Sequence, residues 1–454
     1  MAFGLYLASI IMTFLRPLEL LAPDLAYLRP MLILSVLVFA TSIASVMRTK
    51  QSAATAQHYR MMIGFMVLVG LSVAYKGTGF IVPTVIDYSP SPILYLTTVM
   101  NVTNIRRLRT SVAVMVFCVV CLVFLSIYSY FTGFMVDLLF YKEGLEAVYL
   151  NKSNATSGWA SSVPYLDRSG GHLWRMRSFG FLNDPNDFAQ MLVTTLPLLM
   201  VFRRPGRRLR NFFVIWLPVA AMLFAIYSSH SRGALLGLVS LFFFIIKERL
   251  GPIKTIFLLV AGMVGAMALN FTGGRAYTAD EGSAGGRIDA WAQGLSMLKS
   301  NPLFGVGYGH FTEFNSHTAH NSFVLCFAEL GLVGYFVWLG MLVVAFKQLN
   351  VALQLTKLDD EEHRWALAVR ASLIGFLTCA YFLSRTYHPP LYIILAFAAA
   401  VWMSSVQTIR DKVQKEKALQ PTLWRSLTFK LVIASVILFQ LIVTFKMMTV
   451  GQSE

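Results

Sequence analysis

Charged residues are scarce in this 454-residue chain. Only 13% of its residues are Asp, Glu, Lys or Arg, and 56% are hydrophobic. Soluble domains average about 25% charged residues, so a soluble domain with a membrane tail is excluded. Runs of about 18 or more apolar residues mark helices that span a bilayer, and the chain contains many of them. The composition therefore predicts a polytopic membrane protein.

Cysteine is also rare. All four cysteines lie inside apolar runs, at Cys118, Cys121, Cys326 and Cys379. Such a cysteine behaves as a small hydrophobic residue, and the spacing fits neither a disulfide framework nor a metal site. Cys118 and Cys121 form a C-x-x-C pair. A redox role is disfavoured because that chemistry needs an exposed thiol with a low pKa.

Acidic residues are fewer than basic ones, with 22 Asp and Glu against 38 Lys and Arg. In a membrane protein the excess is explained by Lys and Arg that anchor cytoplasmic loops, so we expect no nucleic-acid partner. No paired carboxylate motif for a divalent metal lies on the opposite face, and we expect neither a metal nor a cofactor. Residues 3–15 lack the basic and small-residue flanks of a cleavable signal peptide.

The apolar runs predict an all-α fold with about 12 to 14 transmembrane helices. We place them at 3–15, 31–47, 61–75, 80–102, 111–131, 186–202, 212–229, 234–246, 253–270, 321–346, 365–383, 388–407 and 431–448. Most basic residues fall in six clusters on one side of this topology, which is therefore cytoplasmic: Arg48–Arg60, Arg106–Arg109, Arg203–Arg210, Lys247–Lys254, Lys347–Arg370 and Arg410–Lys430.

Residues 1–454 are thus expected to form a single integral membrane domain, with a cytoplasmic loop at 347–364. Two long loops, 132–185 and 271–320, lie on the outer side and are rich in Gly, Ser, Asn, His and Trp. Function is expected where irregular polar segments are held on a rigid scaffold.

The first outer loop ends in the segment "HLWRMRSFGFLNDPNDFAQ", residues 172–190. Arg175 and Arg177 stand just outside a predicted span, where the positive-inside bias disfavours basic residues unless an anion binds there. Arginine suits bidentate contact with phosphate. Trp174 either belongs to the interfacial aromatic belt or offers a platform for a sugar ring.

Two helix starts follow on the outer side. Asn183 or Asp184 can cap a helix whose first residue is Pro185, which is a structural explanation of the "NDPND" segment. In "YSSHSRGALLGL", Arg232 lies at or within the membrane edge, where an unpaired charge costs at least about 2.5 kcal/mol. Such an arginine either extends its charge to the interface or serves function.

The second outer loop contains an amphipathic pattern from Arg287 to Lys299. Its apolar residues recur at helical spacing, at Ile288, Trp291, Leu295 and Leu298. We expect this helix to lie on the outer surface, with Arg287 near its N-terminus as an anion site. The glycines of "NPLFGVGYGHF" follow no strand, which disfavours a nucleotide-binding loop.

A further outer motif precedes the predicted span 321–346. His320 and Asn321 stand at its start, and Gly331 and Gly334 within it permit close helix contact. Glu329 is nine residues from His320, on the opposite side of the helix, and is expected to be a buried hydrogen-bonding group. From the residues alone, His320 is equally well an interfacial polar residue or a titratable base.

Together these motifs resemble the O-antigen ligase and Wzy-type polymerase superfamily. His320, Asn321 and Gly331 fit the pattern H-[N/S/Q]-x9-G, and Arg232 and Leu236 fit R-x3-L. The ordered set extends from "RSFGFLNDPND" through "GGRIDAW" and "NPLFGVGYGHF" to "ELGLVGYF", about a third of the chain.

The resemblance implies a GT-C-like membrane glycosyltransferase of the bacterial inner membrane. The donor would be a glycan on undecaprenyl pyrophosphate at the periplasmic face, and the acceptor a hydroxyl of a lipid A core or a growing polysaccharide. Transfer would invert the anomeric carbon without a metal.

By motif position, Arg232 and Arg287 resemble the pyrophosphate-binding arginines of the family, with Arg177 as a third, and His320 resembles its general base. We expect four further side chains to contact the pyrophosphate or the glycan: Arg175, Asn321, Trp174 and Trp291.

Other functions remain open at this stage. A repeat-unit polymerase for exopolysaccharide or O-antigen, or a protein O-glycan ligase, shares the same motifs, and the length of the 132–185 loop leaves the acceptor type undecided. A transporter or flippase would need ionisable groups near the midplane, broken helices and an internal repeat. Asp87 is the best such group, and no repeat is evident.

Overall fold

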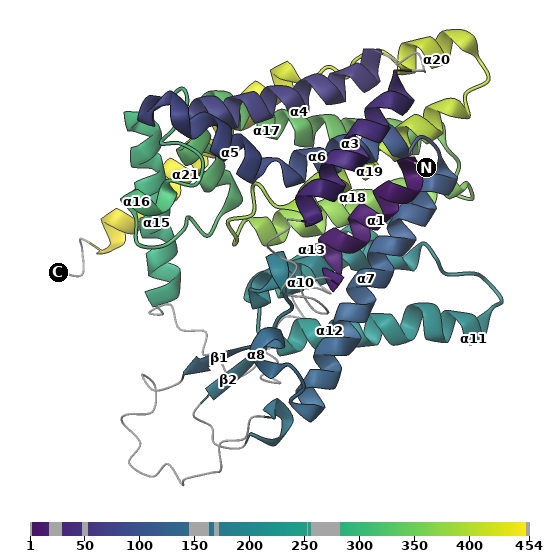
Figure 1. Ribbon diagram of the computed structural model, residues 1–454, viewed down its shortest axis with the longest axis horizontal. Coiled ribbons are helices and arrows are strands. Elements are labelled where there is room, and N and C mark those ends of the chain that lie inside the picture. The colour runs from purple at the N-terminus through teal and green to yellow at the C-terminus, as the bar shows by residue number, and fades with distance from the viewer. Residues whose placement is uncertain are drawn as a thin grey trace.

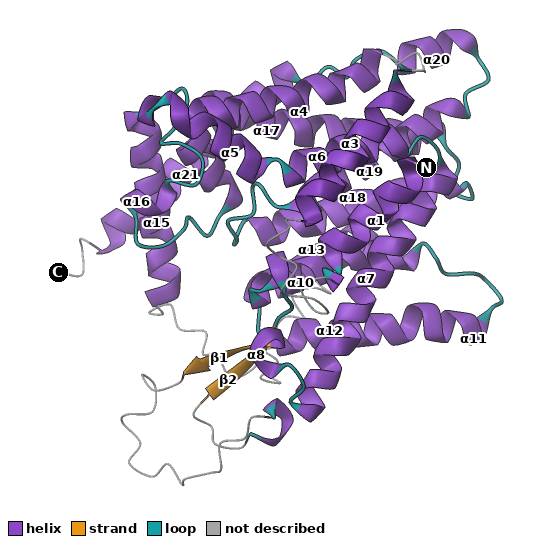
Figure 2. Ribbon diagram, in the orientation of Figure 1, coloured by secondary structure: helices purple, strands orange, loops and turns teal. Residues whose placement is uncertain are grey.

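The computed structural model describes residues 2–17, 30–47, 53–144, 163–167, 172–251, 253–255 and 282–450. Helices dominate these ranges, and their single sheet is one pair of strands (Figure 2). The helices from the first half of the chain are α1 (Ala2–Phe14), α3 (Pro30–Val46), α4 (Ala53–Ser72), α5 (Ile81–Tyr88), α6 (Pro90–Asn101), α7 (Ile105–Thr132), α8 (Val136–Leu139), α10 (Pro185–Met200), α11 (Arg208–Asn211) and α12 (Leu217–Ser228). The others are α13 (Arg232–Leu250), α15 (Gly282–Ser300), α16 (Phe311–Phe314), α17 (Ser322–Leu355), α18 (Glu361–Ala380), α19 (Pro389–Gln407), α20 (Lys412–Ala418) and α21 (Arg425–Val450).

Several described helices are long and apolar enough to cross a membrane. Five segments meet both conditions: Ile105–Thr132, Arg208–Ser228, Ser322–Leu355, Pro389–Gln407 and Arg425–Met448. Shorter apolar helices cover Ala2–Phe14, Pro30–Ala44 and Arg232–Phe244. The prediction of an all-α polytopic membrane protein is confirmed.

Some predicted boundaries were wrong. The span expected at 80–102 is two helices, α5 and α6, because Pro90 has no N–H to continue α5 and instead opens α6. The cytoplasmic loop expected at 347–364 is short, since α17 continues to Leu355 and α18 begins at Glu361. Most of the span expected at 253–270 lies outside the described residues.

The core of the bundle is formed by α17, α18 and α19. Helix α18 packs against α10, α13, α17 and α19, and α19 also packs against α6. In the most apolar stretch of α19, 89% of the residues are buried within the protein, against 17% in the most apolar stretch of α21. Helix α21 therefore lies at the edge of the bundle, where its apolar side chains face lipid.

The two ends of the bundle carry different elements. In Figure 1, α15 and α16 lie at the left end, and α11 and α20 lie at the right end. Parts of both predicted outer loops lie among the described residues. The second contains α15, and the first contains α8 and the antiparallel pair β1 (Phe140–Gly144) and β2 (His172–Met176), in which Tyr141 is opposite Arg175.

Candidate functional site

His320 lies immediately before α17 in a constrained backbone conformation. Its φ is 46°, in the left-handed region, which costs a residue with a side chain roughly 1–2 kcal/mol. Both neighbours are fully buried and hydrogen-bonded: the Ala319 carbonyl accepts from Trp291 Nε1 at 3.1 Å, and Asn321 Nδ2 donates to the Tyr381 carbonyl at 2.9 Å. Backbone strain of this kind persists where the surroundings fix it. These bonds hold the backbone on both sides of His320, whose side chain is half-buried.

Asn321 is the N-cap of α17. Its Oδ1 accepts from the backbone N–H groups of Phe323 at 2.9 Å and Val324 at 3.1 Å, which satisfies donors that a helix start leaves unpaired. Because the whole amide is engaged with protein, Asn321 supports His320 rather than presenting itself to a ligand. The sequence motifs predicted that Asn321 binds substrate. Its role as the helix cap also explains why a polar residue stands at this position.

The surroundings of His320 favour its neutral form. Burial is the first cause that lowers the pKa of His320 below its ordinary value, and the positive charge of Arg287 is the second. His317 and Arg385 lower that pKa further, while the carboxylate of Asp184 acts in the opposite direction. An imidazole that is neutral at pH 7 can accept a proton.

Arg287 is placed by α15, whose apolar face packs on α17 and α21. The predicted helix is confirmed, but its apolar residues are buried against protein: Trp291 is 7% exposed and its ring contacts Tyr381 and Phe439 with centroids 5.6 and 5.4 Å away. Trp291 therefore fixes the turn before His320, and it does not present a free ring face to a sugar. Arg287 precedes Trp291 by one turn of α15 and is half-buried.

Arg232 is the first residue of α13. Ser231 caps this helix by accepting from the Ala234 N–H at 3.4 Å. Glycines bring α13 close to α18, since a Cβ on Gly237 would lie 2.6 Å from Cys379 Sγ. This close packing places the N-terminus of α13 beside the C-terminus of α18, on the end of the bundle that carries the turn between α18 and α19.

Arg175 and Arg177 both have protein partners. Arg175 is 7% exposed, donates from Nε to the Ser229 carbonyl at 3.1 Å and from a terminal nitrogen to Asn186 Oδ1 at 3.2 Å. Arg177 donates to the carbonyls of Asn183 at 3.1 Å and Asp137 at 2.7 Å. These bonds tie β2 and the residue that follows it to α8, to the start of α10 and to the C-terminal end of α12.

Trp174 lies on the other face of β2. Its Nε1 donates to Asp167 Oδ2 at 2.7 Å, and Lys142 Nζ lies 4.8 Å from its ring centroid. Asp137, Lys142, Trp174 and Arg177 line a cavity of about 360 Å³ on this outer element. The indole ring of Trp174 thus forms part of the cavity wall, and Lys142 lies over one of its faces.

Gly331 interrupts α17. Its φ of 64° and ψ of −170° are not helical, and the segment 302–307 satisfies the backbone groups that the break leaves unpaired. Leu332 N–H donates to the Pro302 carbonyl at 2.8 Å, and Gly307 N–H donates to the Glu329 carbonyl at 2.9 Å. The glycine of H-N-x9-G is therefore a helix break filled by a loop, where the sequence had suggested close helix packing.

Two predictions about polar groups near this site are confirmed. Glu329 is 3% exposed and its Oε1 accepts from Phe311 N–H at 3.3 Å, as expected of a buried hydrogen-bonding group. Asp184 caps α10 by accepting from Asn186 N–H at 2.7 Å, with Pro185 at the first helical position. His317 is exposed on the loop before His320.

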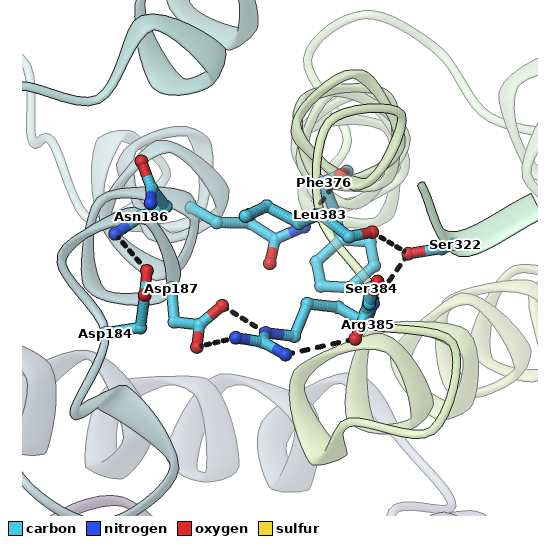
Figure 3. Close-up of polar contacts among 9 residues, drawn as sticks. Asp184, Asn186, Asp187, Ser322, Phe376, Leu383, Ser384 and Arg385 are labelled. Carbon is cyan, nitrogen blue, oxygen red and sulfur yellow. Dashed lines mark hydrogen bonds and ion pairs between the residues drawn. The ribbon is translucent and has the colours of Figure 1, made fainter. Parts of the chain in front are cut away.

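Arg385 was not among the site residues predicted from the sequence. It lies in the turn between α18 and α19, in "SRTYHPP", and forms a two-bond ion pair with Asp187 of α10 (Figure 3). Its charge acts on His320. The signal was available, because Arg385 also lies at a predicted outer boundary, where the positive-inside bias disfavours arginine.

A cavity of about 660 Å³ adjoins the turn that carries Arg385. Ser384 and His388 of that turn line it with Phe181, which lies just before α10, and with Arg16 and Asp87. The remaining walls come from α1, α3, α5 and α6 and are largely apolar, with Met12, Met31, Leu32, Val38, Ile93 and Leu94 among them. The cavity therefore combines an apolar chamber with charged groups.

Comparison with known proteins adds one match. Residues 217–339 match the family described as O-antigen ligase. No curated protein matches the chain significantly. The matched segment runs from α12 to the middle of α17, and it contains Arg232, Arg287, His320 and Gly331. The resemblance seen in the sequence motifs is confirmed.

Proposed function

We propose that this membrane enzyme of the O-antigen ligase and polymerase type transfers a glycan from a polyprenyl pyrophosphate, of the undecaprenyl kind, to an acceptor hydroxyl. The reaction takes place at the periplasmic face of a bacterial inner membrane. One observation carries the proposal. In the segment that matches the family, His320 stands directly before α17 on a constrained backbone, where burial and the charge of Arg287 lower its pKa and so favour an imidazole able to accept a proton.

The proposed reaction is a single displacement at the anomeric carbon of the transferred glycan. The acceptor oxygen forms a bond to the anomeric carbon, and the bond from that carbon to the pyrophosphate oxygen breaks with its electron pair on the oxygen. His320 takes the proton of the acceptor hydroxyl. The products are the lengthened glycan, with inverted configuration, and polyprenyl pyrophosphate. General base catalysis of this type contributes roughly 10²–10⁴-fold.

The arginines supply the electrostatic part. Negative charge develops on the pyrophosphate as its bond to the sugar breaks, and fixed cations aimed at that charge are usually the largest catalytic contribution. Arg232 and Arg287 take this role. Arg232 is the first residue of α13, whose N-terminal dipole also favours an anion, whereas Arg287 lies in the second turn of α15, which begins at Gly282. Arg175 and Arg177 hold the β1–β2 pair in place through their bonds to backbone carbonyls. The cavity that Trp174 lines is the proposed position of the glycan.

The cavity of about 660 Å³ suits the lipid end of the donor. Its apolar walls match a prenyl chain, and Arg16 lies among its polar groups, with its guanidinium 5.9 Å from the Phe181 ring centroid. Phe181 is three residues before Asp184, whose carboxylate acts on His320. A lipid in this cavity would adjoin the turn that carries Arg385, because Ser384 and His388 of that turn line it.

One observation favours a transporter as the second candidate. Helix α17 is broken at Gly331, next to the buried Glu329, and broken helices with ionisable groups are typical of transport sites. Here, however, backbone groups at the break bond to the segment 302–307, which gives the break a structural account.

A transfer assay tests the proposal. The purified protein in lipid nanodiscs receives a polyprenyl-pyrophosphate glycan and either a lipid A core or a second lipid-linked repeat unit. Transfer to the core identifies a ligase, and transfer to the repeat unit identifies a polymerase. Glycan movement across a proteoliposome membrane without a new glycosidic bond would overturn the enzyme assignment in favour of transport.

A further inference from the structure

Asp187 and Arg385 form a buried ion pair that the proposed chemistry does not use. Asp187 lies in the first turn of α10 with its side chain 4% exposed, and Arg385 lies between α18 and α19 with its side chain 21% exposed. Arg385 Nε donates to Asp187 Oδ1, and a terminal nitrogen donates to Oδ2 (Figure 3). Paired bonds of this kind fix the orientation of a guanidinium more tightly than a single contact.

The turn that carries Arg385 is bonded directly to the start of α17. Arg385 N–H donates to Ser322 Oγ at 2.8 Å, and Ser322 Oγ donates to the Leu383 carbonyl at 2.6 Å. Thr386 Oγ1 donates to the Ser322 carbonyl at 2.6 Å, and Asn321 Nδ2 donates to the Tyr381 carbonyl. Four bonds thus join the turn to the two residues that follow His320.

Stability alone is a weak explanation of the pair. A buried ion pair often contributes no more to stability than apolar residues of similar volume, because both charges lose their hydration. The neighbouring contact from α10 to α18, in which Gln190 Nε2 donates to the Phe376 carbonyl at 3.0 Å, joins the same helices without any charge. The charge of Arg385 also acts beyond the pair, and His320 is among the groups whose pKa it lowers.

The charged and titratable groups that act on His320 come from every element around it. Arg287 lies on α15, His317 on the preceding loop, Asp184 at the start of α10 and Arg385 in the turn after α18. Asp187 is paired with Arg385 and compensates its charge. Arg385 is bonded both to α17 and to a buried carboxylate.

We propose that Asp187 and Arg385 are positioning residues for His320: their ion pair holds the turn that fixes the start of α17, and Asp187 limits how much positive charge His320 experiences. The catalytic consequence rests on the proposed function. The positioning itself is a property of the folded protein and can be measured without substrate.

Variants that remove the negative charge of Asp187 or the positive charge of Arg385 distinguish this role from a purely structural one, because they change the charge near His320 in opposite directions. In Asp187→Asn, the charge of Arg385 is uncompensated, which disfavours imidazolium, so the acid side of the pH–rate profile moves to lower pH. In Arg385→Gln a positive charge is lost, and the acid side moves to higher pH. Arg385→Lys keeps the charge but not the paired bonds, so it lowers kcat while the acid side stays close to that of the natural protein. Each shift is expected to reach up to about one pH unit.

A matched control uses an ion pair distant from the site. Glu361→Gln removes the partner of Arg109, whose terminal nitrogen lies 3.3 Å from the carboxylate, and is expected to leave the pH–rate profile unchanged. Asp187→Asn and Arg385→Gln profiles that fall in height without moving, or that move in the same direction, would overturn the positioning role.

The titration of His320 gives a readout that does not depend on activity. Histidine-labelled protein in nanodiscs is titrated by NMR, with the His320 signal identified by its loss in His320→Gln. Opposite displacements of the His320 midpoint in Asp187→Asn and Arg385→Gln support the proposal even if the natural protein transfers no glycan, an outcome that would overturn only the proposed function. An unmoved midpoint in both folded variants overturns the positioning role.

Discussion

In the proposed reaction His320 serves as a base, which requires an uncharged imidazole at neutral pH, and its surroundings favour that form. Burial lowers the pKa of His320 below about 6.5, and Arg287 lowers it further. A base works above its pKa and is lost as the pH falls through it. The acid side of the pH–rate profile is therefore expected below pH 6.5 or so.

Arg287 has two separable effects on this account. Replacing it by Gln removes a positive charge, so the pKa of His320 rises and the acid side of the profile moves to higher pH. The same change removes a cation from the leaving group, which is expected to lower kcat by about 10²–10³-fold. Arg287→Lys is the control, because it keeps the charge and hence the position of the profile. A profile of Arg287→Gln that moves to lower pH would contradict the assignment.

At this scale the sequence was informative about residue types and less so about partners. Motifs were enough to predict His320, Arg232 and Arg287 as candidate site residues, and the local pattern was enough to predict the cap at Asp184. The partner of Arg385 could not be found that way, because Asp187 is 198 residues away in the chain. The left-handed backbone of His320 was also hidden, since it depends on bonds from Trp291 and Asn321.

At the scale of elements, the break in α17 governs the shape of the site. The segment 302–307 fits against the break because neither Gly305 nor Gly331 has a side chain. A Cβ on Gly331 would lie 2.4 Å from the Leu303 carbonyl oxygen, and one on Gly305 would lie 2.5 Å from the Ala328 carbonyl oxygen. The loop that leads back to His320 therefore depends on this contact between backbones.

Gly331→Ala is expected to destabilise the protein. The positive φ alone costs roughly 1–2 kcal/mol, and the overlap with Leu303 adds to it, so the unfolding temperature in detergent falls and activity is lost with it. Gly64→Ala in α4 is the matched control, because nothing lies within 4 Å of its added Cβ. Alanine there is expected to be neutral or slightly stabilising. Equal unfolding temperatures for the two variants would contradict the structural role of Gly331.

Element boundaries were predictable where one local signal dominated. Pattern and length indicated most of the helices, including α15, but the division of 80–102 into α5 and α6 depended on Pro90 being read as a helix start rather than as a tolerated residue. The β1–β2 pair was not predicted, because five-residue strands within a polar loop have no distinct periodic pattern.

At the scale of the whole molecule, the two ends of the bundle differ in chemistry. In Figure 1, α15, which carries Arg287, and α16, which precedes the loop to His320, lie at one end, whereas α11, in the basic segment 203–210, and α20 lie at the other. The positive-inside bias predicts that the basic end faces the cytoplasm and the His320 end faces the periplasm.

Cysteine labelling checks this orientation. His317 and Arg207 are both exposed, and three of the four native cysteines, Cys118, Cys326 and Cys379, are buried, so a single introduced cysteine has little background. With a membrane-impermeant maleimide, His317→Cys is expected to react in intact spheroplasts and Arg207→Cys only after lysis. The reverse pattern would place the site on the cytoplasmic side and contradict a periplasmic reaction.

The most direct test of the central claim is the rate of glycan transfer by His320→Ala compared with the natural protein, with Arg232→Ala alongside. Purified, folded proteins in nanodiscs receive the polyprenyl-pyrophosphate glycan and the acceptor that the natural protein uses, and the new glycosidic bond is measured. The account predicts that both variants insert and fold but lose transfer by at least about 10²-fold. Full transfer by both variants would contradict it.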